Sequence, residues 1–528
     1  MQQDKKSALI IGAGHNGLVA AFYLARRGWE VRLLERRGVV GGAAVTEAFH
    51  PGFRNSMASY TVGLLHADVM RDMALHQQGL RIVERPIANF LPWPDGRYLK
   101  MGGGLQRSQA EAAKFSARDA QRLPAYLDLL RRIAAPVRAL AALPPPRLDG
   151  SWRDLPALLR HAQLWRGIAA DDRAQLLKLV SHSASGFLGE WFESGPVQAL
   201  FGFDSMVGNY ASPHRAGSAY TLLHHVFGEV NGQQGAWGHA IGGMGAITQA
   251  MWRACAGLGV KLQLDTPVRR VLVERGCAVG VELEDGSVEH AGCVLANVNP
   301  KLLFSKLVDA AELTEDYRGQ LAQYRMGSGT LRINVALSEL PQFSALPEAG
   351  EHHSSGIILA PGLDYMDRAW RDAQRQGWSA APIIEMMIPS TVDDSLAPRG
   401  AHVASLFCQH FATTLPDGSS WDAHRERIAD LIVDTVSSYA PNFRGAVIGR
   451  QVLTPLDLER VFGLTDGDIM HGRLTLDQLW AARPAVGYGG YRTPVKGLYI
   501  CGSGAHPGGG VTGLPGRNAA RVVLRETR

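Results

Sequence analysis

The sequence predicts an α/β fold, on three observations. An apolar run at residues 8–11 leads into a glycine-rich turn at 12–17, and helical and strand-like patterns alternate after it. A second glycine-rich turn, at 503–513, separates an apolar run from a last helical segment near the other end of the chain. Residues 260–296 carry the alternating β-branched residues that are typical of strands.

The first glycine-rich turn has the spacing of a dinucleotide-binding fingerprint. Gly12 permits the tight turn, Gly14 lets the backbone approach a pyrophosphate, and Gly17 lets the following helix pack close to the strand. The next strand ends at Glu35, where a carboxylate accepts hydrogen bonds from an adenosine ribose. An acid at this position disfavours the 2′-phosphate of NADP. These residues predict a Rossmann-type domain.

The residues that follow this acid favour FAD over NAD. Gly41 and Gly42 allow a second stretch of backbone to approach the same cofactor, which the longer FAD requires. The C-terminal turn fails as an independent fingerprint, because Pro507 and Pro515 interrupt it and no strand with an acid follows. It fits as the far half of one FAD site, since a helix beginning near Gly513 would point its positive end at the flavin.

Composition and charge exclude several classes of protein. The net charge is +5 over 528 residues and the basic residues are scattered, so we expect no nucleic-acid partner. No apolar run is long enough for a transmembrane helix. The short polar start before the nucleotide strand leaves no room for a signal peptide, so a cytoplasmic location is the expectation.

The cysteines exclude dithiol chemistry. The five cysteines form no C-x-x-C pair and none precedes residue 255, whereas a flavin dithiol reductase needs two thiols close together beside the flavin. We therefore expect free thiols. No metal site is expected either, because histidine pairs such as His352 and His353 are adjacent and diverge on regular structure.

The order of these patterns predicts a discontinuous organisation. Three segments are expected to form the FAD-binding domain, namely 1–80, 235–300 and 485–528. The substrate domain is expected to be α+β, with a helical part at 81–234 and a β/α part at 301–484.

A second dinucleotide fingerprint is missing from the sequence. Residues 242–245 are the nearest candidate, but no clean strand precedes them. A resident NAD(P)H domain is therefore not expected. Electrons would enter from the organic substrate and leave to oxygen, a quinone or a carrier protein.

The chain resembles the phytoene-desaturase-like branch of FAD-dependent oxidoreductases, and within it the pyridine nucleotide-disulphide oxidoreductase domain-containing protein 2 group. The motifs that carry the resemblance run through the whole chain, and include G-A-G-H-N-G-L-V-A-A (12–21), E-R-R-G-V-V-G-G-A-A-V-T-E (35–47), G-A-W-G (235–238), G-G-M-G-A (242–246), L-T-P-L-D-L-E-R-V-F-G-L (453–464) and C-G-S-G-A-H-P-G-G-G-V (501–511). It implies a two-domain, amine-oxidase-like fold.

The fingerprint and the resemblance together give a set of FAD-binding residues. The set consists of Gly12, Gly14, His15, Asn16, Gly17, Glu35, Arg36, Gly41, Gly42, Ala43, Val268, Gly502, Ser503, Gly510 and Val511. Many relatives carry an acid where this chain has Ser503. Arg36 is expected to contact the cofactor or the surface rather than to catalyse.

The implied reaction is dehydrogenation, or desaturation, of a small apolar or conjugated organic substrate by hydride transfer to flavin N5. The catalytic candidates are His506, His225 and Trp237; a structural histidine and core packing are the alternatives for the first and the last. Two other functions stay open: a flavin-dependent isomerase or saturase, and a non-catalytic FAD-bound regulatory protein. A homodimer is left open. An arginine-rich helical face that touches a membrane is the alternative to a solvated helix.

Overall fold

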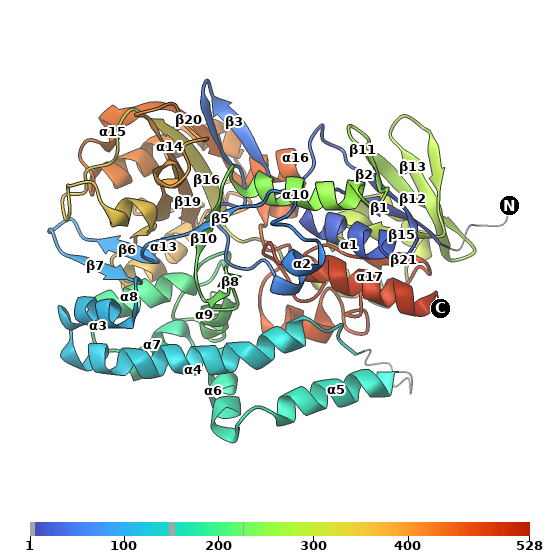
Figure 1. The fold of residues 1–528 in the computed structure, drawn as a ribbon, viewed down its shortest axis with the longest axis horizontal. Coiled ribbons are helices and arrows are strands. Elements are labelled where there is room, and N and C mark those ends of the chain that lie inside the picture. Colours follow the sequence, from blue (N-terminus) through green and yellow to red (C-terminus); the bar gives the residue numbers. More distant parts are fainter. Residues whose placement is uncertain (1–5, 147–153, 225, 528) are drawn as a thin grey trace.

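The computed structural model describes residues 6–146, 154–224 and 226–527. Two sheets of different kinds lie at opposite ends of the molecule (Figure 1). The first is five-stranded and parallel, with the strand order β11-β2-β1-β15-β21. Its strands are β1 (Ser7–Ile11), β2 (Glu30–Leu34), β11 (Lys261–Gln263), β15 (Cys293–Ala296) and β21 (Leu498–Ile500). Segments from the start, the middle and the end of the chain therefore meet in one sheet.

Three helices cover this sheet and bring the fingerprint to its edge. The helices α1 (His15–Ala25), α10 (Met244–Ala256) and α17 (Leu514–Glu526) pack together, with α1 between the other two. The apolar residues of β1 are buried, as expected for a parallel strand covered on both faces. Helix α17 begins directly after Gly513, where the sequence predicts it.

A small antiparallel sheet extends the cofactor half. It contains β12 (Val268–Glu274), β13 (Cys277–Leu283) and β14 (Val288–His290). The turn between the last two strands places Gly286 at φ +85°, a left-handed conformation that glycine adopts without strain. Asp285 and Gly286 lie in the turn of this β13–β14 hairpin.

The second large sheet is seven-stranded, with the order β20-β16-β19-β18-β17-β6-β7. Neighbouring strands in this sheet run antiparallel, except that β6 and β17 run parallel. The strands are β6 (Asn89–Pro92), β7 (Tyr98–Met101), β16 (Thr330–Leu337), β17 (Gly356–Leu359), β18 (Ile383–Met387), β19 (His402–Gln409) and β20 (Val447–Leu453).

Helices pack on both faces of this sheet, because successive strand residues point to opposite sides. Phe90 joins the core under α14 (Trp421–Ser437) and α15 (Phe443–Ala446), whereas Leu91 joins the core of the helical insert. The insert contains α3 (Leu105–Ala113), α4 (Ala117–Ala141), α5 (Leu155–Arg166), α6 (Ala170–Ser181), α7 (Ala184–Trp191), α8 (Gly195–Asp204) and α9 (Thr221–His224). Helix α13 (Leu363–Gln376) packs against α8.

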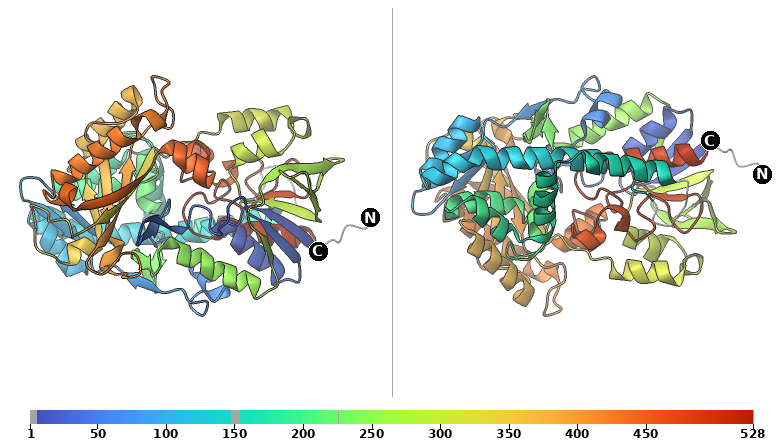
Figure 2. Two further views of the ribbon diagram at one scale, coloured as in Figure 1. Left: turned by 90° about the horizontal axis from the view of Figure 1, so that it is seen from above. Right: turned by 90° about the horizontal axis from the view of Figure 1, so that it is seen from below.

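Helix α4 links the two halves. It runs along one side of the molecule (Figure 2), and the carbonyl of Ala141 at its end accepts a hydrogen bond from Asn518 in α17 at 3.2 Å. The remaining elements include α2 (Ala67–Asp72), β3 (Thr46–His50), β4 (Phe53–Ser56), β5 (Ile82–Glu84), β8 (Glu229–Val230), β9 (Gln233–Gln234), β10 (Gly238–Ala240), α11 (Pro300–Leu302), α12 (Glu315–Gln323) and α16 (Pro455–Phe462).

Two segments cross the boundaries that the sequence suggests. The β3–β4 hairpin lies within 1–80 but contacts β19 and β20 of the seven-stranded sheet. Residues Leu303 and Tyr317, within 301–484, belong to the core of the cofactor half. Segment order along the chain does not reveal such crossings.

Helix α5 leaves apolar side chains exposed. They are Leu155, Leu158, Leu159 and Trp165. Within the described residues every helix is too short or too polar to span a bilayer. Contact of this surface with a membrane stays a prediction.

Candidate functional site

The glycine turn brings three segments into close contact. Gly12 adopts φ +94° between β1 and α1. A Cβ at Gly17 would lie 2.3 Å from the carbonyl oxygen of Gly12, and a Cβ at Gly14 would lie 2.9 Å from Nδ2 of Asn297. That amide also donates to the Gly12 carbonyl at 3.1 Å, from the end of the adjacent parallel strand β15. Side chains at Gly14 or Gly17 would therefore displace the turn.

The Gly41-Gly42 pair forms a second backbone wall beside this turn. Gly41 donates its N–H to the Ala13 carbonyl at 3.0 Å and bridges Gly14 in parallel. A Cβ at Gly42 would lie 3.2 Å from the Gly14 Cα. The backbone at residues 12–14 and the backbone at residues 41–42 lie close together, and neither segment has room for a side chain at these glycine positions.

Glu35 is buried at the end of β2 with its carboxylate beside the turn. Oε2 accepts from the Ala13 N–H at 2.8 Å, and Oε1 accepts from the Arg37 N–H at 3.0 Å. Carboxylate oxygens accept more than one hydrogen bond each, so acceptor capacity is left for ribose hydroxyls.

The C-terminal loop closes the site from the far side. Ser503 Oγ accepts a hydrogen bond from Asn16 Nδ2 at 3.0 Å, which joins the loop to the start of α1. A Cβ at Gly516 would lie 2.0 Å from the Asn16 carbonyl oxygen, so α17 and α1 are in backbone contact. Both ends of the chain thus form one site.

A cavity of about 430 Å³ follows these segments. Ten of the predicted FAD-binding residues line it: Gly12, Gly14, His15, Asn16, Glu35, Arg36, Gly42, Ala43, Val268 and Ser503. Gly17, Gly41 and Gly502 lie behind its wall, where they allow close packing rather than contact. The Arg36 guanidinium donates to the Val461 carbonyl at 2.9 Å near the end of α16.

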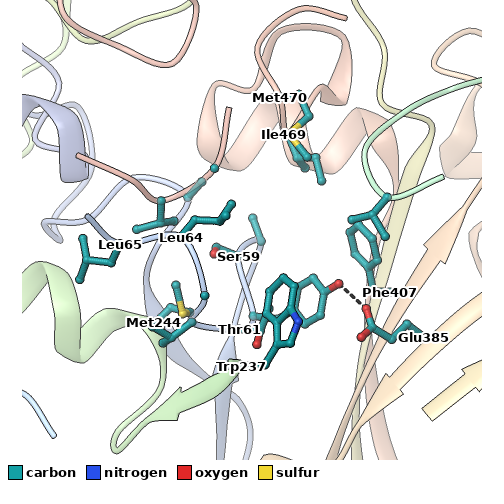
Figure 3. A pocket seen from close by; sticks show the side chains of 18 of the residues that line it. Ser59, Thr61, Leu64, Leu65, Trp237, Met244, Glu385, Phe407, Ile469 and Met470 are labelled. Atoms are coloured by element: carbon teal, nitrogen blue, oxygen red, sulfur yellow. Dashed lines mark hydrogen bonds between the residues drawn. The ribbon is translucent and has the colours of Figure 1, made fainter. Parts of the chain in front are cut away.

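A second cavity of about 140 Å³ adjoins the first and shares four lining residues with it, namely His15, Ala43, His471 and Ser503. Gly510, Val511 and Trp237 line only the second cavity. Its walls are mainly apolar: Figure 3 shows Leu64 and Met244 on the side opposite Glu385 and Phe407.

Buried polar atoms at the junction fit a bound cofactor. Nε2 of His15 and Oδ1 of Asn16 are buried and have no hydrogen-bond partner in the described part of the chain. Burial lowers the pKa of His15 to about 4, so its imidazole is neutral near pH 7. Because buried polar atoms are normally hydrogen-bonded, these two atoms fit the polar edge of a flavin or its pyrophosphate.

The structure brings only part of the catalytic candidates to the second cavity. Trp237 lines it. His506 lines neither cavity: its ring lies near the backbone of Leu140 and Ala141 at the end of α4, and burial lowers its pKa to about 3. Its backbone is in the predicted loop, but the side chain points away from both cavities. His225 lies outside the described residues.

Sequence reasoning missed His471 and Arg483. His471 lines both cavities, adopts φ +56°, and has a pKa that burial lowers to about 3. Arg483 is fully buried and donates to the carbonyls of Met470, His471 and Ser503 at 2.8, 3.2 and 3.0 Å. Asn297 could have been identified from the sequence, since it follows a buried strand. Arg483 could not, because no local pattern indicates which carbonyls its side chain contacts.

The glycine turn at residues 242–245 has a packing role. Thr46 Oγ1 accepts from the Gly245 N–H at 2.9 Å, and Ser56 Oγ accepts from the Met244 N–H at 3.0 Å. These hydroxyls occupy N–H groups of α10 that a phosphate would need. The turn therefore holds the β3–β4 hairpin.

The cysteines are free thiols, as expected. Four are buried and Cys277 is partly exposed. Burial raises the pKa of the Cys255 and Cys501 thiols, so neither is a reactive thiolate near pH 7.

Replacing Glu35 with Gln should weaken FAD binding by about tenfold or more, because charge-assisted hydrogen bonds to the ribose are lost. The measurement is the dissociation constant of FAD, from the fluorescence of released flavin. Glu30→Gln, on the same strand but exposed and paired with Lys261, is the control and should bind FAD like the wild type. An unchanged constant for Glu35→Gln would exclude a ribose contact.

Comparison with known proteins supports this interpretation. The family model "Flavin containing amine oxidoreductase" matches residues 17–524. The chain is 39% identical to pyridine nucleotide-disulfide oxidoreductase domain-containing protein 2 of Rattus norvegicus, over 99% of this chain and 94% of that protein. It is 24% identical to a lycopene-forming phytoene desaturase of Pantoea ananas, over 98% and 99% of the two chains.

The fold is also that of a solved oxidoreductase from Methanosarcina mazei, with a TM-score of 0.63 and 16% identity over 98% of this chain and 100% of that one. The predicted Rossmann-type, amine-oxidase-like fold and the FAD cofactor are thereby confirmed. The chain belongs to the flavin-containing amine oxidoreductase family and is an FAD-dependent oxidoreductase that resembles its phytoene-desaturase-like members.

Proposed function

We propose that the protein dehydrogenates a largely apolar organic substrate in the second cavity. The observation that best supports this proposal is that a mainly apolar cavity adjoins the FAD cavity. The two cavities share the lining residues His15, Ala43, His471 and Ser503. The chemistry that FAD supplies when bound is acceptance of a hydride from a substrate C–H bond. The adjacent carbon loses a proton, and the electron pair left behind forms the new double bond.

The chain's own residues position the substrate and exclude water. Leu64, Leu65, Met244 and Phe407 supply apolar surface, which orders a substrate C–H bond near the junction. Trp237 forms part of the same wall.

Two kinds of group are available to accept the proton. The imidazoles of His15 and His471 have pKa values that burial lowers to about 4 and about 3, so they are weak bases. Burial raises the pKa of Glu385, so this carboxylate is a stronger base than an exposed one. Tyr60 donates a hydrogen bond to Glu385 and fixes its orientation.

The electron acceptor is proposed to be oxygen, a quinone or a carrier protein. The α10 glycine turn offers no second nucleotide site, since Thr46 and Ser56 occupy its N–H groups.

Anaerobic titration of the purified holoenzyme tests this function. A panel of apolar and conjugated compounds is added, and the flavin absorbance is followed. Bleaching by one of them, restored by oxygen or a quinone, is the expected result. Turnover only after chemical reduction of the flavin would instead assign an isomerase or saturase. Tight FAD with no turnover and a stable protein partner would assign a regulatory role.

A further inference from the structure

A charged cluster lies at the sheet-side wall of the second cavity: Tyr60, Glu385 and Phe407 line the cavity, whereas Arg332 is not among its lining residues. Glu385 on β18 and Arg332 on β16 both pair with Phe407 on the strand between them, so the register places all three side chains on one face. Tyr60 stacks on the Phe407 ring at 4.7 Å and donates to Glu385 (Figure 3, dashed line). The Arg332 guanidinium lies 4.5 Å from the centre of the Tyr60 ring.

Arg85 adds a second guanidinium, which lines the cavity itself. Nη2 donates to Thr61 Oγ1, and the guanidinium carbon lies 5.8 Å from the centre of the Trp237 ring. The backbone N–H of Arg85 donates to the backbone carbonyl of Trp237 at 3.1 Å, which fixes the main chain beneath the side chain. Its Nε is buried and has no hydrogen-bond partner among the described residues. A guanidinium has five N–H donors, so donors remain for a ligand.

The charged side chains of this cluster act on one another. Arg85 and Arg332 are two buried cations, and Glu385 is the carboxylate that acts on both. Asp204 also lines the cavity, and burial raises its pKa to about 8. Burial lowers the pKa of Arg332 to about 10, which leaves it charged. A buried guanidinium with an unpaired donor is unfavourable unless a ligand acceptor pairs with it.

We propose that the substrate carries one carboxylate on an otherwise apolar body, and that Arg85 binds this carboxylate in the second cavity. The proposal rests on the dehydrogenase function proposed above and narrows its substrate class. A pure hydrocarbon offers no acceptor to the unpaired Arg85 donor, whereas a carboxylate matches the planar donor fork of arginine. Arg85 is thus a specificity-determining residue, and the apolar walls hold the part of the molecule that reacts.

Ligand binding to the holoenzyme tests this assignment without turnover. Octanoate, decanoate and hydrocinnamate are each compared with their methyl esters by calorimetry and by perturbation of the flavin spectrum. We expect the wild type to bind at least one of these carboxylates about tenfold or more tightly than its ester, the size of a charge-assisted hydrogen bond. Equal binding of every acid and its ester would overturn the proposal.

Three variants separate recognition from structural support. Arg85→Met should lose the preference for the acid, and Arg85→Lys should retain part of it. Glu385→Gln should bind the acid more tightly, because a competing anion is removed while Tyr60 keeps an oxygen acceptor. A purely structural cluster would weaken binding in both Arg85→Met and Glu385→Gln, which would contradict the proposal. The exposed Arg81→Met is the control for loss of a positive charge and should leave the preference unchanged.

The test also distinguishes the two proposals from each other. Selective acid binding without bleaching of the flavin by any compound would contradict the dehydrogenase function but support the role of Arg85. Bleaching by a neutral compound, with no preference for acids, would do the opposite.

Discussion

Gly17→Ala should give a protein that purifies without FAD. The added Cβ would lie 2.3 Å from the Gly12 carbonyl oxygen, closer than carbon and oxygen can approach, and near Asn297 Nδ2 as well. The start of α1 must then move from β1, which shifts the N–H groups that face the pyrophosphate. A displacement near 1 Å at such a site weakens function by about 100-fold. We expect a loss of this size in FAD affinity, measured by titration of the apoprotein.

A matched control separates this effect from a general glycine effect. Gly189 lies in α7, and a Cβ there would meet no atom within 4 Å. Gly189→Ala should therefore bind FAD normally and be slightly more stable, since alanine favours helix. If Gly17→Ala retains wild-type FAD affinity, the close approach of α1 to the turn is not required for binding.

Arg483→Met should lose FAD and stability together. Arg483 donates hydrogen bonds to the carbonyls of Met470 and His471 in one loop and of Ser503 in the C-terminal loop. It therefore holds these two loops together at the junction of the cavities. His471 adopts φ +56°, a strained conformation for a residue with a side chain, which these hydrogen bonds help to hold. Removing a buried, hydrogen-bonded charge costs about 3–5 kcal/mol in the free energy of unfolding.

Urea denaturation with and without added FAD measures both effects. Arg483→Lys keeps the charge but cannot reach all three carbonyls, so it should be intermediate. The exposed Arg97→Met, which loses a surface ion pair with Asp95 and a distant contact with the Trp93 ring, should change stability by less than about 1 kcal/mol. A stable Arg483→Met that holds FAD like the wild type would show that the two loops are positioned without this side chain.

The cofactor half of the site is largely readable from the sequence. Gly12, Gly14 and Gly17 lie in one turn, and one helix and one strand separate this turn from Glu35. Local patterns therefore fix the relative positions of these residues. The Gly41-Gly42 pair lies close enough in sequence to the ribose-binding acid to extend the same reasoning.

The C-terminal half was predicted less completely. Its loop and helix lie where the glycine pattern places them, but the side-chain directions within the loop do not follow from the pattern. Ser503 points to Asn16 in the cofactor site. His506, three positions later, points toward α4, whose end could not be located beside it without the fold.

The second cavity and the charged cluster beside it were not predictable in this way. Arg85, Glu385 and Arg332 come from three distant segments, and each is an ordinary charged residue in its local sequence. Only the strand register places Glu385 and Arg332 on either side of Phe407, and only the path of the chain before β6 brings Arg85 to the same wall.

The sequence by itself determined the cofactor and its fingerprint, because a glycine turn, an acid at a strand end and a helix start interact over short distances along the chain. The tertiary structure decided which side chains line the second cavity. It placed Trp237 and His471 at the second cavity, turned His506 away from it, and gathered two arginines around one carboxylate. The physical reason is that these contacts depend on long-range packing and strand register, which no local pattern specifies.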